Sequence, residues 1–253
     1  MTNPDTTNYD ALAWFYDRYW GDFADYVLPI LDSLGLADLP PGATILDLAC
    51  GTGRLAAKLT ERGFKVTGID LSPEMLRYAE QNAPGTTFQQ DDARHFTVSA
   101  PMVAVVCTYD SLNHMQHMAE LSTVFNQVYA ALQTNGLFLF DLNMEAGYIN
   151  RWHGTWGIQG DDHAAVIRSS YVPETRQADM WASLFRRLPG SDAYTRTDIQ
   201  FSQRCFMLDH VLRALCEAGF GRVAAYHSAH GQLHPSEGER TFFVAHKGTT
   251  RYA

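Results

Sequence analysis

Residues 45–56, ILDLACGTGRLA, are the most informative part of the sequence about the fold. Its first residues are continuously apolar and predict a short buried strand, whereas a helical pattern begins after the turn Gly51-Thr52-Gly53. Glycine permits the tight backbone turn that joins the two and lets a ligand approach the main chain closely. The helix N-terminus then presents free N–H groups and a partial positive charge. We therefore interpret this stretch as a ligand-binding strand–turn–helix unit.

Strands and helices alternate on both sides of this unit. Further apolar segments predict strands over 65–70, 86–92, 102–109 and 136–142, and the pattern resumes later with strands over 222–229 and 240–247 joined by a loop over 230–239. Amphipathic segments between them predict crossover helices. This alternation is typical of a doubly wound, Rossmann-like α/β domain whose mostly parallel sheet has seven strands.

One internal segment, residues 146–206, has a different character. It lacks long apolar runs and instead alternates polar and apolar residues, with turns at Pro173-Glu174-Thr175 and at 189–192. That pattern is typical of antiparallel strands. We therefore divide the chain into an α/β domain over 1–145 and 207–253, with N-terminal helices as a cap, and an inserted antiparallel β subdomain over 146–206.

Carboxylates follow the predicted strand ends. Asp47 lies inside the first strand, Asp70 ends the second, and the pair Asp91-Asp92 ends the third, just before Ala93. Ligands in such sheets bind at the carboxyl ends of the strands, where an acid after the second strand can hold ribose hydroxyls. Asp47 would repel a pyrophosphate but can accept a hydrogen bond from a cationic group. The three positions together predict a ligand with an ammonium, a ribose and an adenine.

The motifs DLACGTG (47–53), GIDLSPEML (68–76) and QDDA (90–93) resemble those of class I S-adenosylmethionine-dependent methyltransferases, over about residues 40–145. The resemblance implies that Gly51 and Gly53 lie against the methionine part, Asp70 on the ribose, and Leu71 or Met75 against the adenine. It also implies that either Asp91 or Asp92 lies near the adenine amino group. The residues that we expect to bind this cofactor, or its product S-adenosylhomocysteine, are Tyr9, Tyr16, Asp47, Ala49, Cys50, Gly51, Gly53, Asp70, Leu71, Met75, Asp91, Asp92, Ala93 and Tyr109.

A narrower resemblance concerns the acceptor. The opening helix with Tyr9 and Tyr16-Asp17, and the stretch YDSLNHM (109–115), are similar to small-molecule N- or O-methyltransferases, including those that act on amino sugars. The inserted β segment resembles the extra antiparallel layer that some of these enzymes use as a substrate lid or a dimer surface. The resemblance thus implies a small-molecule acceptor, and an inserted layer that serves either as a lid over this acceptor or as the surface of a homodimer.

The expected chemistry is in-line methyl transfer from a sulfonium to a nitrogen or oxygen, which depends on holding the nucleophile close and aligned. His114, which follows the fourth strand, is the candidate general base, although a packed or surface role is equally compatible with its position. Tyr9, Tyr16 and Tyr109 are candidate neighbours of the sulfonium. The two N-terminal tyrosines also suit a helix core. Cys50 suits packing better than nucleophilic work, because no neighbour in the sequence lowers its pKa.

Composition restricts the class of partner and the compartment. The 253 residues carry a formal net charge of −9, which disfavours nucleic acid and anionic membrane surfaces. The N-terminus has no secretory pattern, and the uncharged run from 121 to 140 contains too many polar residues to cross a membrane. Four widely separated cysteines suit reduced thiols in the cytoplasm and predict no metal site.

Two other functions remain compatible with the sequence. Residues 51–56 also fit the pattern G-x-G-x-x-[GA], so an NAD(P)-dependent oxidoreductase is one alternative, opposed by Asp47 and by the acids after the third strand. The other is a non-catalytic module that binds the cofactor without turnover.

Overall fold

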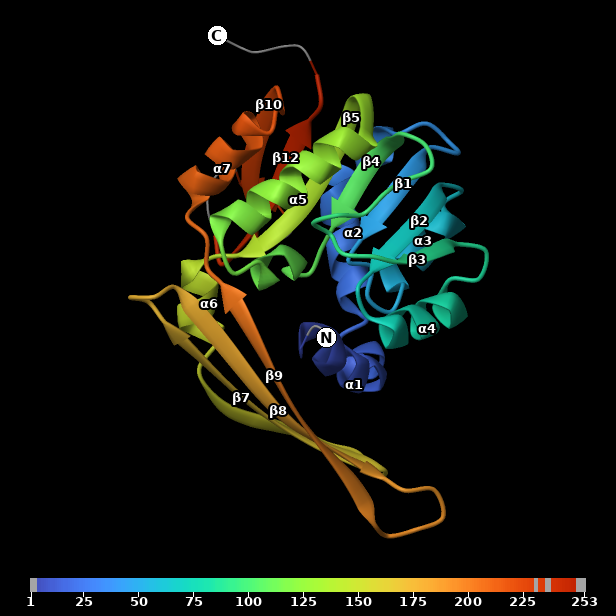
Figure 1. The fold of residues 1–253 in the computed structure, drawn as a ribbon, viewed down its shortest axis with the longest axis vertical. Coiled ribbons are helices and arrows are strands. Elements are labelled where there is room, and N and C mark those ends of the chain that lie inside the picture. Colours follow the sequence, from blue (N-terminus) through green and yellow to red (C-terminus); the bar gives the residue numbers. More distant parts are fainter. Residues whose placement is uncertain (1–3, 230–231, 235–237, 249–253) are drawn as a thin grey trace.

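The computed structural model describes residues 4–229, 232–234 and 238–248, which form two β-sheets and the helices around them (Figure 1). The larger sheet has eight strands in the order β11-β10-β12-β5-β4-β1-β2-β3. Their bounds are β1 Thr44–Leu48, β2 Lys65–Asp70, β3 Thr87–Gln90, β4 Met102–Cys107, β5 Leu132–Asn143, β10 Arg222–Ala229, β11 Gln232–His234 and β12 Arg240–His246. Strands β1 to β5 pair in parallel, and β12, β10 and β11 continue the sheet antiparallel.

The sheet confirms the expected doubly wound α/β class and corrects its strand number. All seven expected strands are present, and the eighth is β11, which lies in the segment 230–239 that we expected to be a loop. It pairs antiparallel with β10, and Ser228 lies opposite Leu233. Three residues are too short to show the alternation by which a strand is recognised in a sequence.

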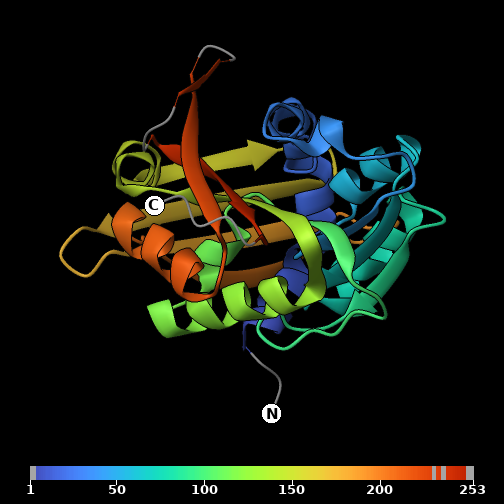
Figure 2. The ribbon, with the colours of Figure 1, turned by 90° about the horizontal axis from the view of Figure 1, so that it is seen from above.

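Helices cover both faces of the larger sheet (Figure 2). On one face lie α2 (Phe23–Ser33) and α3 (Arg54–Glu61), with α4 (Pro73–Asn82) beside α3, and on the other lie α5 (Met118–Ala131) and α7 (Leu208–Glu217). Strands β1, β4 and β5 are covered on both sides, which is why their sequences are almost continuously apolar. The sequence pattern predicted crossover helices between the strands, and α3, α4 and α5 lie there.

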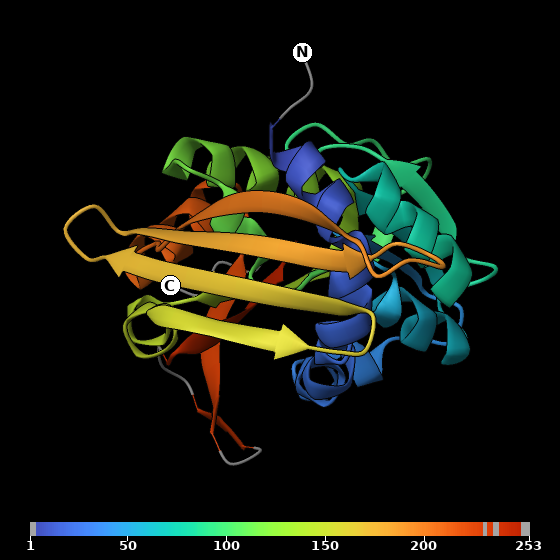
Figure 3. The same ribbon diagram turned by 90° about the horizontal axis from the view of Figure 1, so that it is seen from below.

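The smaller sheet contains four strands. They pair antiparallel, as the alternating pattern of the inserted segment predicted. It follows the short helix α6 (Glu145–Arg151) and consists of β6 (Gly154–Gln159), β7 (His163–Val172), β8 (Gln177–Arg187) and β9 (Tyr194–Arg204). Figure 3 shows that one face of this sheet is open and that the helices lie behind the other. We call it the second sheet.

Helix α1 (Pro4–Tyr19) fills the space between the two sheets (Figure 1). Its buried Leu12 and Phe15 pack against Ile167 and Phe201 on the inner face of the second sheet. Its other side reaches the larger sheet, where the Asp10 carboxylate accepts a hydrogen bond from the Ser72 hydroxyl. Helix α1 therefore lies across the carboxyl ends of the parallel strands and closes the crevice in which such sheets bind ligands.

Two further observations apply to the part of the chain that the structure describes. None of its helices is both long and apolar enough to span a membrane. Nor do three or more His, Cys, Asp or Glu side chains gather there in the way that a metal ion requires.

Candidate active site

The turn between β1 and α3 contains three residues with left-handed backbone. Ala49 has a φ of 57°, Gly51 of 55° and Gly53 of 74°. Such a conformation is costly for alanine and is found mainly at functional sites. A Cβ atom on Gly51 would lie 3.6 Å from the Tyr16 ring, an ordinary van der Waals distance, so α1 lies directly over the turn.

Gly53 packs closely against a neighbouring helix. A Cβ atom at this position would lie 2.8 Å from the Cα atom of Ala79 in α4. The physical requirement for glycine here is the close packing of α3 against α4.

Asp47 is a buried acid whose carboxyl group lacks a full set of hydrogen-bond partners within the described part of the chain. Its side chain is only 2% exposed, and its Oδ2 atom has no hydrogen-bond partner among the described residues. Burial and the charge of Asp70 raise the pKa of Asp47 to about 8. A buried carboxylate of this kind gains stability from a cationic partner, so the end of β1 is a favourable place for an ammonium group.

Asp70, at the end of β2, is held in a fixed orientation. Its Oδ2 atom accepts a hydrogen bond from the Gly51 N–H at 2.8 Å, and its Oδ1 atom accepts one from the Ser72 N–H at 2.9 Å. Burial raises the pKa of Asp70, although these N–H groups act against that rise. The carboxylate is thus fixed at the cavity wall, with lone pairs left to accept hydrogen bonds from a ligand.

The predicted site residues converge on one cavity of about 180 Å³. It is lined by the predicted residues Tyr9, Tyr16, Ala49, Gly51, Asp70, Leu71, Met75, Asp91, Asp92, Ala93, Tyr109 and His114. An adjoining cavity of about 40 Å³ shares Tyr16, Ala49 and Tyr109 with the first and is lined by Asp47 and Cys50. Burial raises the pKa of the Cys50 thiol, which keeps it protonated and suits packing.

Beyond β3 the two neighbouring acids differ in their partners. Both carboxylate oxygens of Asp92 accept hydrogen bonds from Arg94, whose guanidinium also donates to Glu120 at 2.8 Å. Burial by itself raises the pKa of Asp92, but Arg94 outweighs it and holds that pKa below the ordinary value. Asp91 accepts from the side chain of Gln89 and from the main-chain N–H of Asp92. Arg94 and Glu120 line the cavity and were not predicted from the sequence.

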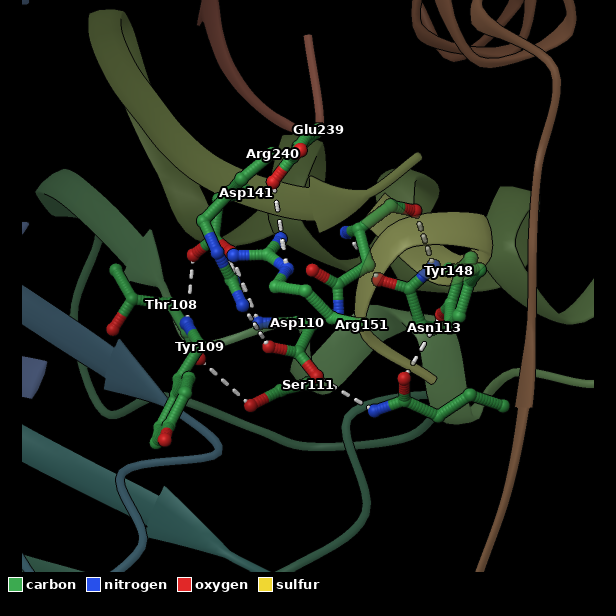
Figure 4. A network of polar contacts seen from close by, with 12 residues as sticks. Thr108, Tyr109, Asp110, Ser111, Asn113, Asp141, Tyr148, Arg151, Glu239 and Arg240 are labelled. Carbon is green, nitrogen blue, oxygen red and sulfur yellow. Dashed lines mark hydrogen bonds and ion pairs between the residues drawn. The ribbon is translucent and has the colours of Figure 1, made fainter. Parts of the chain in front are cut away.

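The turn after β4 is held by a buried ionic network (Figure 4). Tyr109 and Asp110 both have left-handed backbone, with φ of 64° and 51°. The Asp141 carboxylate, in β5, accepts hydrogen bonds from their two N–H groups at 2.7 and 3.0 Å. Arg240, from β12, forms ion pairs with Asp110 at 2.6 Å and with Asp141. The two acids and the arginine thereby stabilise a backbone conformation that these residues rarely adopt alone.

The same network orients the aromatic wall between the two cavities. The Tyr109 ring stacks on Phe23 at 4.1 Å between centroids, and the Arg240 guanidinium lies over both rings. The Tyr16 ring lies 5.9 Å from that of Tyr109. Burial raises the pKa of Tyr109 to about 12 and raises that of Tyr16 well above its ordinary value. Both side chains therefore present neutral phenols to a ligand.

His114 ends the short 3-10 helix η2 (Ser111–His114) and lies beside Tyr9 of α1. The Nε2 atom of His114 is 2.7 Å from the Tyr9 hydroxyl oxygen and 3.3 Å from the Nε2 atom of Gln203 in β9. The neighbouring Asn113 is buried and donates hydrogen bonds to the carbonyl groups of Asn143 and Arg204. The loop that carries His114 is thus attached to both sheets.

Sequence reasoning missed the residues that hold the site together. Asp110 lies inside the stretch 109–115 that we singled out, but its role depends on Asp141 and Arg240, which are distant in the chain. Gln203 sits in a strand with no recognisable motif. The available signal was a lone arginine at the start of an apolar strand, which indicates a buried partner of opposite charge.

Comparison with known proteins agrees with this geometry. Residues 45–136 match the family model described as a methyltransferase domain. A putative methyltransferase of Bacillus subtilis, YqeM, is 34% identical over 221 residues, which cover 85% of this chain and 88% of the relative. The chain belongs to the S-adenosylmethionine-dependent methyltransferases.

Other relatives of this methyltransferase have more specific names. A dTDP-3-amino-3,6-dideoxy-alpha-D-glucopyranose N,N-dimethyltransferase of Streptomyces fradiae is 30% identical over 146 residues, or 56% of each chain. The crystal structure of an S-adenosylmethionine-dependent methyltransferase from Clostridium acetobutylicum matches the fold with a TM-score of 0.78 at 21% identity, over 95% of this chain and 99% of that one. These comparisons give no support to the oxidoreductase alternative.

The residues present fit the cofactor of this family. The unpartnered Oδ2 atom of buried Asp47 calls for a cationic group, which the amino-acid end of S-adenosylmethionine carries. The Asp70 carboxylate at the cavity wall suits a ribose diol. The neutral phenols of Tyr16 and Tyr109 suit a sulfonium, because cations are attracted to aromatic faces. Buried Thr52, whose Oγ1 atom also has no partner among the described residues, lines the same small cavity as Asp47.

Proposed function

We propose that this methyltransferase transfers a methyl group to a nitrogen or oxygen atom of a small molecule, with His114 as the general base. The observation that carries the proposal is the contact between His114 Nε2 and the Tyr9 hydroxyl, 2.7 Å long, in the wall of the cavity that also holds Asp70. The candidate base and the acid expected to bind the ribose thus line the same cavity. The S. fradiae relative, named for an amino-sugar substrate, supports a small acceptor.

The proposed roles of the cofactor residues follow their positions. Asp47 receives the ammonium group, Asp70 the ribose hydroxyls, and Leu71 and Met75 the adenine ring. Either Asp91 or Asp92 receives the adenine amino group. Asp92 is also paired with Arg94. When bound, S-adenosylmethionine supplies a methyl group that is activated by its sulfonium. The second sheet and α1 cover the acceptor side of the cavity.

Tyr9 and His114 together provide a path for the proton that the acceptor loses. The acceptor N–H or O–H proton passes to the Tyr9 oxygen, while the Tyr9 hydroxyl proton passes to Nε2 of His114. One O–H bond breaks at Tyr9 as another forms there, so the tyrosine ends neutral and the imidazole carries the charge. General-base assistance of this kind contributes about 10²–10⁴-fold in rate.

A labelled-methyl transfer screen across amines, hydroxyls and carboxyls tests the activity. We expect transfer to at least one class, and His114→Ala should lower kcat by about 10²-fold or more while leaving cofactor affinity unchanged. Equal turnover in wild type and variant would remove His114 from the mechanism. Transfer to none of the three classes would favour the non-catalytic binding module.

The open face of the second sheet is our candidate for a homodimer surface. Val166 and Tyr194 are each 48% exposed on this face. The guanidinium of Arg168 lies over the Trp181 ring, 4.5 Å from its centroid. Apolar side chains exposed on one face support association with a second copy. Sedimentation velocity should show a dimer that Val166→Glu dissociates; a monomeric wild type would refute the assignment.

The four cysteines are free, which supports a cytoplasmic location.

A further inference from the structure

A chain of polar contacts links the ionic network of Figure 4 to His114 through Gln203. Gln203 points to the inner face of β9 and is 4% exposed. Its Nε2 atom donates a hydrogen bond to Asp110 Oδ2 at 2.7 Å, and its Oε1 atom accepts one from the Tyr148 hydroxyl at 2.9 Å. The side chain is therefore held at both ends of its amide group.

These partners decide which way the amide faces. The Asp110 carboxylate is paired with Arg240 and acts as an acceptor, so the atom of Gln203 that faces it is the nitrogen. An amide nitrogen carries two hydrogens. The second hydrogen lies on the side that faces His114, whose Nε2 atom is 3.3 Å from the Gln203 nitrogen.

The direction of this contact determines the state of the imidazole. An amide nitrogen has no lone pair with which to accept a hydrogen bond, so it is compatible with Nε2 only when that atom carries a lone pair. The ring proton of neutral His114 then resides on Nδ1. In this tautomer the Tyr9 hydroxyl also donates to Nε2, which leaves the lone pairs of its oxygen for the proton of an acceptor.

We propose that Gln203 is a positioning residue, which holds His114 neutral with Nε2 available as the base. The inference rests on the proposed role of His114 and deepens it. It also gives the second sheet a function in the site itself, because β9 supplies Gln203. The same end of β9 is fixed to the His114 loop, since Gln116 donates to the carbonyl of Ser202.

Nuclear magnetic resonance of the 253-residue protein, labelled with ¹⁵N-histidine, tests the proposal without any change to the site. The imidazole nitrogens of His114, assigned by comparison with His114→Ala, report directly which nitrogen carries the proton. We expect a protonated Nδ1 and an unprotonated Nε2 at neutral pH. A protonated Nε2 would overturn the proposal.

Variants then separate positioning from simple packing. Gln203→Met keeps the length of the side chain but removes the donor, so the Nδ1–H preference of His114 should be lost and kcat should fall at least about tenfold, with the KM for S-adenosylmethionine unchanged. Gln200→Met is the matched control, because its side chain is exposed on the opposite face of the same strand. An unchanged tautomer in Gln203→Met would refute the positioning role.

Failure of this inference is distinguishable from failure of the proposed function. If His114→Ala retains full turnover while Gln203→Met changes the tautomer, the base assignment fails and the control of the ring by Gln203 holds. If His114→Ala is inactive but the wild-type tautomer is Nε2–H, the base holds and Gln203 is excluded. If Gln203→Met does not fold, the wild-type spectrum alone decides.

Discussion

Replacement of Asp47 by asparagine should make the protein more stable and its cofactor affinity weaker. In the folded protein the pKa of Asp47 is raised from 3.8 to about 8 by burial, then by the charge of Asp70. The unfolded chain loses this environment and ionises with an ordinary pKa. Asparagine keeps the size and an acceptor oxygen but carries no charge, so it removes the mismatch between the two states.

The sign and size of the effect follow from proton linkage. Between about pH 4 and pH 8 the folded state holds a proton on Asp47 that the unfolded state has released, so the free energy of unfolding falls by about 1.4 kcal/mol per pH unit as the pH rises. The accumulated loss is roughly 4 kcal/mol at pH 7, reaches a plateau of roughly 6 kcal/mol above pH 8 and is absent below pH 4. At roughly 2–4 °C per kcal/mol, Asp47→Asn should raise Tm by roughly 10 °C or more at pH 8 and by only a few degrees at pH 5.

Cofactor binding should show the opposite trend. A cationic group beside Asp47 favours the ionised carboxylate, so below pH 8 the binding of S-adenosylmethionine should release a proton. Calorimetry in two buffers of different ionisation enthalpy measures that proton. In Asp47→Asn the release should disappear, and the Kd should rise roughly 10–100-fold with the loss of a charge-assisted hydrogen bond worth about 1.5–3 kcal/mol.

Both measurements can contradict this reasoning. A variant that melts below wild type at pH 8, or whose Tm difference does not grow with pH, would show that Asp47 is already ionised and compensated in the folded protein. Proton release that persists in Asp47→Asn would assign the titration to another group.

Two further predictions concern stability. In urea unfolding, Gly53→Ala should destabilise the protein by about 1–3 kcal/mol more than Gly63→Ala. Both glycines have a positive φ, but only a Cβ atom at Gly53 would meet Ala79. Equal losses of stability in the two variants would show that backbone conformation alone causes the effect. Arg240→Met should cost about 3–5 kcal/mol, since it leaves two buried carboxylates without their cation, and added salt should not reproduce the loss. A thermal shift of less than a few degrees for Arg240→Met would mean that the network is not needed for folding.

Much of the site could be predicted because its determinants are local. Glycines in a strand-to-helix turn and acids at successive strand ends are fixed by the alternation of β1, β2 and β3 with their helices, so Gly51 and Asp70 meet without knowledge of distant contacts. Gly53 belongs to the same motif, but its close contact with Ala79 depends on how two helices pack, so that contact could not be predicted from the sequence.

Contacts between distant segments could not be predicted. The sequence marks His114 as following a strand, but only the fold brings Tyr9 to 2.7 Å from it and adds Gln203 from another sheet. The role of Arg240 likewise depends on the pairing of β12 with β5, which aligns it with Asn143 and brings it to Asp141. Neither segment contains a periodic pattern that would predict these contacts of His114 and Arg240.

Local patterns along the chain were enough to predict the class of sheet, the position of the glycine turn and the acids around it, because backbone hydrogen bonding and hydrophobic periodicity operate over a few residues. The protonation of Asp47, the orientation of His114 and the left-handed turn at Tyr109 arise only in the folded molecule. Those properties depend on burial and on charges supplied from elsewhere in the chain, and burial exists only once the sheets and helices have packed.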